Sequence, residues 1–200
     1  MVMPATHRRW TTVDVRALMD ESRPWPRYEL IGGELLVTPA PDAQHQFAIS
    51  ELLLILGAYV DRGGVGVAVT SPADLELVPG SISQPDIFVV PFASTPSAEG
   101  GTSWAFVRSL LLAVEVISPS SVRSDRVEKR DHYMDAGVPE YWVVDLDARV
   151  VERWTAPQET PEVLRDELRW RPAGAERALV MHLPDVFDVI FRKLTLTRGR

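Results

Sequence analysis

The sequence contains no cysteine in its 200 residues. This absence excludes a disulfide framework and any metal site built from thiolates, and it fits a reducing compartment. The start of the chain, MVMPATHRRW, lacks the apolar segment of a signal peptide. No apolar run approaches the length that spans a bilayer, since the best of them covers only Leu52 to Leu56. We therefore expect a cytoplasmic protein with no membrane-spanning segment.

Several common site motifs are also missing from the sequence. Its histidines form no cluster with the spacing of zinc ligands. The glycine-rich segment 63–66 lacks the lysine and the following helix of a phosphate-binding loop, and it lacks the spacing of a dinucleotide-binding fingerprint. No nucleophile elbow is present. The sequence therefore favours none of the three classes of protein that these motifs mark.

Basic residues are fewer than acidic ones, 21 against 28, which gives a formal net charge of −7. This charge argues against a surface built mainly to hold nucleic acid, although it is compatible with a local basic cleft. Acids at a catalytic metal site add to the count without repelling the substrate once the metal is bound. An apolar content of 46% predicts one compact domain, residues 1–200, with a sizeable core.

A strand–helix–strand unit occupies the second half of the chain. The apolar segment 110–117 precedes a charged helix pattern at about 124–136, and the apolar segment 140–145 follows it. Further strands are predicted at 28–31, 34–37, 65–70, 74–78, 86–91, 149–154 and 178–182, and further helices at 12–20, 42–60 and 184–191. This order predicts an α/β fold of the mixed α+β kind, with a central mixed β-sheet flanked by helices.

The segment that Asp42 caps is the best candidate for a long buried helix. Its apolar residues predict packing along the sheet through Phe47, Leu54 and Ala58. A second segment, 92–104, is rich in Ser, Pro, Gly and Ala, and it predicts a mobile loop. Because this loop joins two strands that carry acids, we expect it to be able to fold over a bound substrate.

Two acids, Asp86 and Glu115, stand on otherwise apolar strands. An unpaired carboxylate is costly in such a place, so a metal ion or another cation is expected beside it. If the two strands are neighbours, both carboxylates converge at one end of the sheet, and paired carboxylates with open positions suit Mg²⁺ or Mn²⁺. The structural alternative is that Asp86 caps a turn after Pro85 and that Glu115 pairs with a core arginine.

Lys129 lies on the charged helix after Glu115. It can belong to a solvated face, with Asp125 as its i, i+4 partner. It can also point toward the sheet, because Tyr133 shares its face one turn later. His45 has a similar ambiguity, since a lone histidine near a helix start is more often structural than catalytic.

Taken in order, these residues belong to a longer pattern. Its segments are Tyr28-Glu29-Leu30, Gly33-Glu34, His45, Gln84-Pro85-Asp86, Glu115 to Pro119, Asp125-Arg126, Lys129, Tyr133, Gly137-Val138 and Glu140 to Asp145. The pattern resembles the Uma2 family, the DUF820 group of restriction endonucleases, which belongs to the PD-(D/E)XK nuclease superfamily. The resemblance is strongest over residues 10–154 and weaker beyond them.

The resemblance implies a restriction-endonuclease-like core in which Asp86 and Glu115 bind the metal, with the carbonyl of Val116 as a further ligand. The superfamily pattern places a lysine two residues after the second acid, where this sequence has Ile117. Residues two apart share a strand face, so the expected ammonium is missing from its usual place. The resemblance therefore implies that Lys129 supplies this ammonium, close to both acids.

The resemblance also assigns residues around these ligands. His45 and Glu34 match family positions near the site, and Asp125 and Tyr133 match the positions around the lysine. We treat His45 as a catalytic candidate, and Glu34, Asp125 and Tyr133 as supporting residues.

The expected function is that of a Mg²⁺- or Mn²⁺-dependent endonuclease, with nucleic acid, DNA in the first place, as its substrate. Lys129 would position a water molecule or stabilise charge on the phosphate, and His45 would orient the water or contact the phosphate. One alternative is a catalytically degenerate nucleic-acid-binding or regulatory module of the same fold, which the acidic charge and the displaced lysine favour. Another is a metal-dependent hydrolase of a different phosphate ester. The oligomeric state is open, a homodimer being one option.

Overall fold

The computed structural model describes residues 9–19, 25–97, 101–118 and 121–196. The predicted end of the first helix at Asp20, part of the predicted loop 92–104, and Pro119 lie outside these residues. In the described part of the chain, no helix is long and apolar enough to cross a membrane.

A six-stranded mixed β-sheet forms the centre of the molecule, as the sequence predicts. The strand order is β3-β4-β5-β6-β7-β8, and only the pair β5–β6 of this sheet is parallel. That pair flanks the charged helix, because parallel neighbours need a long crossover connection. The strands are β3 (Gly66–Thr70), β4 (Ile87–Pro91), β5 (Leu112–Val116), β6 (Tyr141–Asp145), β7 (Val150–Trp154) and β8 (Glu162–Leu164).

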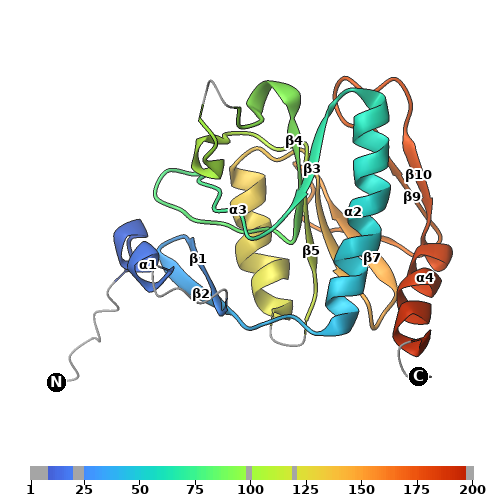
Figure 1. Ribbon diagram of the computed structural model, residues 1–200, viewed down its shortest axis with the longest axis horizontal. Helices are drawn as coiled ribbons and strands as arrows, with labels where there is room; N and C mark the ends of the chain where they lie inside the picture. The colour runs from blue at the N-terminus through green and yellow to red at the C-terminus, as the bar shows by residue number, and fades with distance from the viewer. Residues whose placement is uncertain (1–8, 20–24, 98–100, 119–120, 197–200) are drawn as a thin grey trace.

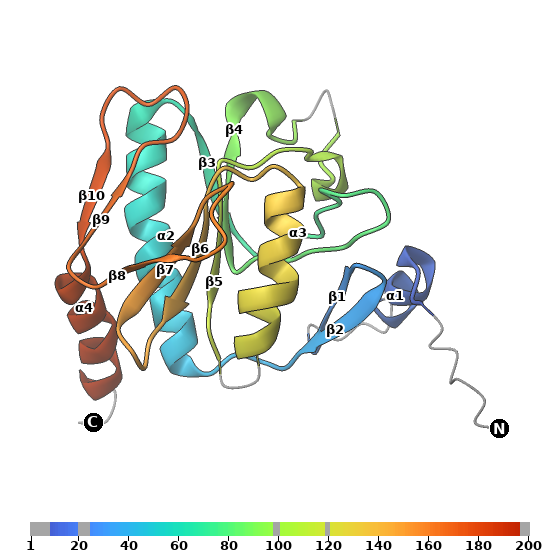
Figure 2. The same ribbon diagram turned by 180° about the vertical axis from the view of Figure 1, so that it is seen from behind.

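Helices cover both faces of this sheet, which confirms the predicted fold class (Figures 1 and 2). Two of them, α2 and α4, pack on one face, and α3 packs on the other. The α-helices are α1 (Thr12–Met19), α2 (Ala43–Gly63), α3 (Lys129–Asp135) and α4 (Leu183–Leu196). A π-helical turn, Ser124–Glu128, leads directly into α3.

Two hairpins lie outside the main sheet. The first consists of β1 (Arg27–Ile31) and β2 (Glu34–Thr38), and it lies with α1 beside the lower end of α3 (Figures 1 and 2). The second pairs β9 (Glu167–Trp170) with β10 (Leu179–His182), next to α2 and α4. The first hairpin turns at Gly32 and Gly33, whose φ angles are 61° and 83°, as expected for a two-residue turn that needs positive φ.

Two features of the fold differ from the sequence-based expectation. The predicted strand 74–78 is wrong, since Leu75 forms only an isolated bridge with Ser83 and the chain turns back at Gly80, whose φ is 78°. The short strands β8 and β9 were not predicted, because their alternation of polar and apolar residues is weak. Neither difference affects the strands that carry the two acids.

The side chains of β5 alternate between two cores. Leu112, Val114 and Val116 belong to the cluster beneath α2 and α4, whereas Ala113 belongs to the cluster beneath α3. Every second side chain of a strand shares a face. Glu115 therefore faces the α3 side of the sheet.

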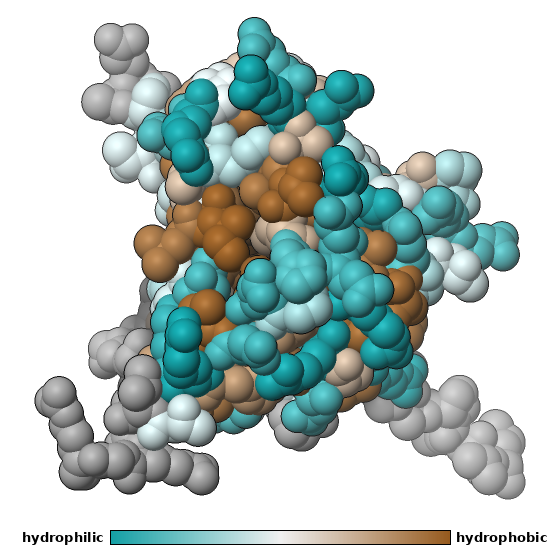
Figure 3. All heavy atoms as spheres, turned by 90° about the vertical axis from the view of Figure 1, so that its right-hand side faces the viewer, coloured by the Kyte–Doolittle hydropathy of each residue, from teal (hydrophilic) through white to brown (hydrophobic). Residues whose placement is uncertain are grey.

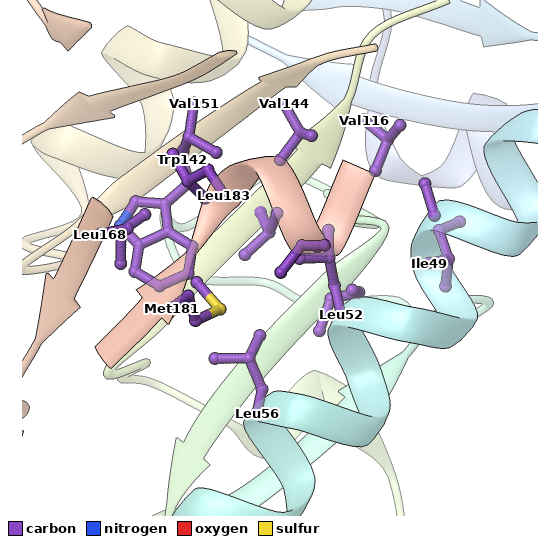
Figure 4. Packing of buried hydrophobic residues seen from close by; sticks show 14 of the residues in the cluster. Ile49, Leu52, Leu56, Val116, Trp142, Val144, Val151, Leu168, Met181 and Leu183 are labelled. Atoms are coloured by element: carbon purple, nitrogen blue, oxygen red, sulfur yellow. The ribbon is translucent and has the colours of Figure 1, made fainter. Parts of the chain in front are cut away.

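Helix α2 buries a stripe different from the predicted one. The stripe begins with the adjacent Ala48 and Ile49 and continues at spacings of three to four residues with Leu52, Leu56 and Val60. Figure 4 shows that the labelled members of this stripe point toward the strands. The predicted packing is wrong for Leu54, which is 67% exposed, and for the exposed Ala58, while Phe47 is half-buried. Apolar residues surround much of this helix, so periodicity alone does not select the buried stripe.

Two leucines of α2, Leu52 and Leu54, give a direct test of this packing. Leu52→Ala is expected to lower the free energy of unfolding by about 2–5 kcal/mol, because Leu52 is buried in the core. Leu54→Ala, the matched control one half-turn away, should change it by less than about 0.5 kcal/mol. Urea unfolding of both variants measures the difference, and equal losses would contradict this orientation of α2.

The first turn of α2 is held by a side-chain cap. Asp42 Oδ1 accepts a hydrogen bond of 2.8 Å from the backbone N–H of His45, which satisfies a donor that the helix itself leaves free. The helix ends at Gly63, three residues later than predicted, and Gly64 follows with a φ of 62°. The cap thus fixes the part of the helix that carries His45.

A hydrophobic hollow lies on the face that contains α2 and β10. Figure 3 shows hydrophobic side chains gathered on this face among hydrophilic ones. Leu54 and Val180 line a hollow of about 990 Å³ between α2 and the hairpin of β9 and β10. Neither Asp86 nor Glu115 lines it, so cavity volume does not locate the predicted carboxylate site.

Candidate active site

Asp86 and Glu115 lie on neighbouring strands, as predicted. Strands β4 and β5 pair antiparallel with Ile87 opposite Val114, so Asp86, just before β4, comes opposite Glu115. Opposite residues of an antiparallel pair have their side chains on the same face. Asp86 Oδ2 also accepts a 3.0 Å hydrogen bond from the backbone N–H of Val116. Both acids are buried, with 3% and 2% of their surface exposed.

Asp86 is surrounded by hydrogen-bond donors. Its Oδ1 lies 2.9 Å from Nη2 of Arg27, and its Oδ2 lies 3.0 Å from Nε2 of His45. Burial by itself raises the pKa of this carboxyl, but the hydrogen bond from His45 and the charges of His45 and Arg27 outweigh burial and hold the pKa well below its usual range. The same contact raises the pKa of His45 against the effect of its burial. Asp86 is therefore ionised at neutral pH.

Glu115 has a different set of partners. Its Oε1 accepts hydrogen bonds from Nζ of Lys129 at 3.1 Å and from the hydroxyl of Tyr133 at 3.3 Å. Burial raises the pKa of Glu115 well above its usual value, and the charge of Lys129 opposes this rise only in part, because Asp86 and other acids stand nearby. The two acids thus lie side by side in environments that move their pKa values in opposite directions.

Lys129 points into the molecule and does not belong to a solvated helix face. It is 4% exposed, and its Nζ lies 2.9 Å from Glu29 Oε2 and 3.5 Å from Asp125 Oδ1 in addition to its contact with Glu115. Burial lowers the pKa of Lys129, but these carboxylates more than compensate and raise it well above its usual value. The ammonium lies beside Glu115 as predicted, whereas the direct cationic partner of Asp86 is Arg27.

The π-helical turn before α3 sets the direction of Lys129. The backbone N–H of Lys129 donates to the carbonyl of Ser124, five residues earlier, and the hydroxyl of Tyr141 donates to the carbonyl of Asp125 at 2.8 Å. An i to i−5 bond inserts one residue into a helical turn, and such turns are frequent at functional sites. The extra residue in this turn rotates the helix that follows, so the turn influences the direction in which the Lys129 side chain leaves α3.

Two residues of the site, Glu29 and Arg27 on β1, were not predicted. Glu29 is buried, and its Oε1 accepts a 2.8 Å hydrogen bond from the backbone N–H of Gln84 while Oε2 contacts Lys129. A signal for Glu29 was present, since it is an acid on an apolar strand like Glu115. No local pattern distinguishes Arg27 from the other arginines.

The remaining predicted residues fall at different distances from the acids. His45 reaches Asp86 from the first turn of α2, as predicted. Glu34 is exposed at the start of β2, where it lines a hollow of about 510 Å³ with Arg123. It is not among the residues that contact the buried acids. The role of the Val116 carbonyl as a ligand stays a prediction.

The predicted loop 92–104 lies at the wrong end of the sheet to cover the acids. It follows the end of β4 and precedes the start of β5, whereas Asp86 and Glu115 lie at the start of β4 and the end of β5. A five-residue strand is about 17 Å long, and Figure 1 shows the loop and the start of α3 at opposite ends of the sheet. Within the described residues, the loop contains short 3₁₀ helices at Phe92–Ser94 and Trp104–Phe106. The expectation that it folds over a substrate at these acids is therefore wrong.

The charges of this region suit a divalent cation. Among the described residues, four buried acids surround two permanent cations, Arg27 and Lys129, so the carboxyl groups outnumber the cations. The four acids are Glu29, Asp86, Glu115 and Asp125. Within the described ranges, no three His, Asp or Glu side chains are already arranged to hold an ion. Mg²⁺, however, is typically held by one or two carboxylates and keeps several waters, so the carboxylates of Asp86 and Glu115 are ligands of the kind that such an ion prefers.

Comparisons with known proteins agree with this architecture. Residues 14–183 match the model of the Uma2 family, described as "Putative restriction endonuclease". Among solved structures, the chain is similar to a protein from Anabaena variabilis described as "a putative nuclease belonging to DUF820". The two are 20% identical, and the match covers 88% of this chain and 98% of that one with a TM-score of 0.73. At this identity the likeness shows the fold alone. A search of curated proteins finds no match.

Proposed function

Because the chain belongs to the Uma2 family, we propose that it is a nuclease that hydrolyses phosphodiester bonds with the help of Mg²⁺ or Mn²⁺. The observation that carries this proposal is the meeting of Asp86, Glu115 and the buried ammonium of Lys129 at one end of the sheet. The expected substrate is DNA. The acidic net charge does not oppose this, since a bound ion and the cations beside the acids supply local positive charge.

In this proposal, Asp86 and Glu115 hold the ion, with the Val116 carbonyl as a further ligand. When bound, the ion would polarise the scissile phosphate and lower the pKa of a coordinated water. Tyr133 keeps Glu115 in place through its hydroxyl, and His45 does the same for Asp86. His45 is also placed to orient a water molecule or to contact the phosphate.

Lys129 has the central electrostatic role in this proposal. Attack on a phosphodiester accumulates negative charge on the phosphate, and a cation already in place stabilises that charge without reorganisation. Glu29 and Asp125 hold the Lys129 ammonium next to Glu115. The cation is therefore preorganised by buried carboxylates, and their charges raise the pKa of Lys129 so that it stays protonated at neutral pH.

The proposal is tested by incubating the protein with plasmid DNA, linear duplex, single-stranded DNA and RNA, each with Mg²⁺, Mn²⁺ or EDTA. We expect metal-dependent cleavage of at least one DNA substrate and none with EDTA. Binding of nucleic acid without cleavage in either metal would contradict the proposal and favour a catalytically degenerate module. A phosphate monoester and bis(4-nitrophenyl) phosphate, tested in parallel, would identify a hydrolase of other phosphate esters.

A further inference from the structure

Both carboxylate oxygens of Asp86 already have hydrogen-bond partners in this structure. Its Oδ1 is paired with Arg27, and its Oδ2 receives both the side chain of His45 and the backbone N–H of Val116. These three hydrogen bonds leave one acceptor site of the carboxylate, on Oδ1, directly beside the guanidinium of Arg27. A divalent ion bound there would lie next to this positive charge, so Arg27 has to move away if Asp86 is a metal ligand.

Two of the three partners are held by rigid elements. The N–H of Val116 is part of the backbone of β5 in the centre of the sheet. His45 lies in the first turn of α2, which the cap at Asp42 fixes. The N–H of Val116 cannot withdraw from Asp86 without a change in the backbone of the sheet, and the short side chain of His45 is buried on a fixed turn of helix.

Arg27 is held differently. It reaches Asp86 from β1, in a two-stranded hairpin outside the main sheet, with a side chain longer than that of His45. Its guanidinium lies 4.8 Å from the ring centroid of Trp25, and its Nε is buried with no hydrogen-bond partner among the residues that the structure describes. An arginine side chain has many rotatable bonds, so it can leave Asp86 while β1 stays in place. Arg27 is thus the partner that can be displaced.

We propose that Arg27 closes the metal site by holding Asp86, and that a phosphate of the nucleic acid draws it away when an ion binds. This inference rests on the proposed metal-dependent function. A bound divalent ion at Asp86 repels the guanidinium, while the planar fork of an arginine matches the oxygens of a phosphate. Arg27 therefore exchanges one anionic partner for another, and it becomes a phosphate-binding residue in the loaded site.

This exchange couples the binding of the metal to the binding of nucleic acid. Without nucleic acid, most molecules have Asp86 closed, and the apparent dissociation constant for the ion rises in inverse proportion to the open fraction. With nucleic acid, Arg27 has a new partner and the open fraction increases. Because such coupling is reciprocal, the ion must tighten the binding of nucleic acid by the same factor.

The test compares the parent protein with Arg27→Met and a control, with bound Mn²⁺ measured from the electron paramagnetic resonance signal of the free ion. Without nucleic acid, Arg27→Met should bind Mn²⁺ on the order of tenfold more tightly, equivalent to about 1.4 kcal/mol. Arg149→Met is the control, because Arg149 forms an ion pair with Asp188 at the exposed surface. The two atoms lie 2.9 Å apart, the same distance as in the pair of Arg27 and Asp86. Its Mn²⁺ affinity should equal that of the parent. Should Arg27→Met fail to fold by circular dichroism, Arg27→Gln serves for the same titration, since it also removes the charge.

A second titration includes a short phosphorothioate DNA duplex. The duplex should raise the Mn²⁺ affinity of the parent severalfold and have little effect on that of Arg27→Met. A variant that binds Mn²⁺ no more tightly than the parent would overturn the role of Arg27 and leave the proposed function intact. If the parent and both variants bind no Mn²⁺, the metal-dependent function itself is wrong.

Discussion

Lys129→Met is expected to reduce metal-dependent cleavage by on the order of 10²–10³, the usual loss when one preorganised charge-stabilising group is removed. Methionine approximates the length of lysine but carries no charge. The loss should appear in kcat, because the cation acts on charge that develops during attack. Cleavage by Lys129→Met at the rate of the parent would remove Lys129 from the mechanism. Single-turnover assays at saturating Mn²⁺ measure the effect.

The same substitution should also destabilise the metal-free protein. Lys129 contacts three buried carboxylates, and a buried charge without its partner costs about 3–5 kcal/mol. Mn²⁺ should recover part of this loss, because it supplies positive charge to the same acids. Urea unfolding with EDTA and with Mn²⁺ separates the two contributions.

A second substitution at Ile117 distinguishes a missing cation from a damaged fold. Ile117 packs against the core on the α3 side, and it shares the strand face of Glu115. Ile117→Lys in the Lys129→Met background should therefore restore part of the activity by returning an ammonium to the position that the superfamily pattern uses. Ile117→Met in the same background is the matched control and should restore none.

Asp86→Asn and Glu115→Gln are expected to abolish metal-dependent cleavage alike but to change the stability of the metal-free protein in opposite directions. Asparagine at position 86 leaves the buried cation of Arg27 without its anion, which should cost about 3–5 kcal/mol. Glutamine at position 115 removes one charge from a region where acids outnumber cations, and Lys129 keeps Glu29 and Asp125. Glu115→Gln should therefore unfold at an equal or higher urea concentration than the parent.

The directions of the pKa shifts lead to the same expectation. A carboxyl whose pKa is lowered on folding, such as Asp86, contributes stability above its unfolded value near 3.8, and this contribution is lost as the pH falls. A carboxyl whose pKa is raised, such as Glu115, contributes stability below its unfolded value near 4.5 and loses it as the pH rises through the folded pKa. At pH 7, ionised Asp86 stabilises the fold, whereas ionising Glu115 costs stability.

Both variants are measured by urea unfolding in EDTA at pH 7, and by the shift of the melting temperature on addition of Mn²⁺. The parent should gain stability from Mn²⁺, and both variants should lose this gain. If Asp86→Asn and Glu115→Gln shift the metal-free stability in the same direction, the electrostatic difference between the two acids is wrong. If both retain the Mn²⁺ effect, the ion does not bind at these carboxylates.

Patterns within single elements predicted much of the fold and part of the site. The hairpin at Gly32 and Gly33, the cap at Asp42 and the strand–helix–strand unit around Glu115 all follow from residues within one turn or one strand of each other. The burial of Asp86 and Glu115 was also readable, because an acid inside an apolar strand needs a partner. The exposed Leu54 is a residue that such patterns predicted wrongly. Helix α2 is apolar on most sides, so its sequence does not indicate which stripe of residues packs on the sheet.

The sequence by itself determined that two acids stand on apolar strands of a mixed sheet, since the apolar character of a strand and the turns that bound it are local properties. Only the tertiary structure decided which cation meets which acid. Arg27 and Asp86 are 59 residues apart, and their contact depends on how the hairpin of β1 and β2 docks beside the sheet. Glu29 joins Lys129 through the same docking. Ion pairs between distant elements follow from packing geometry, which local periodicity does not encode.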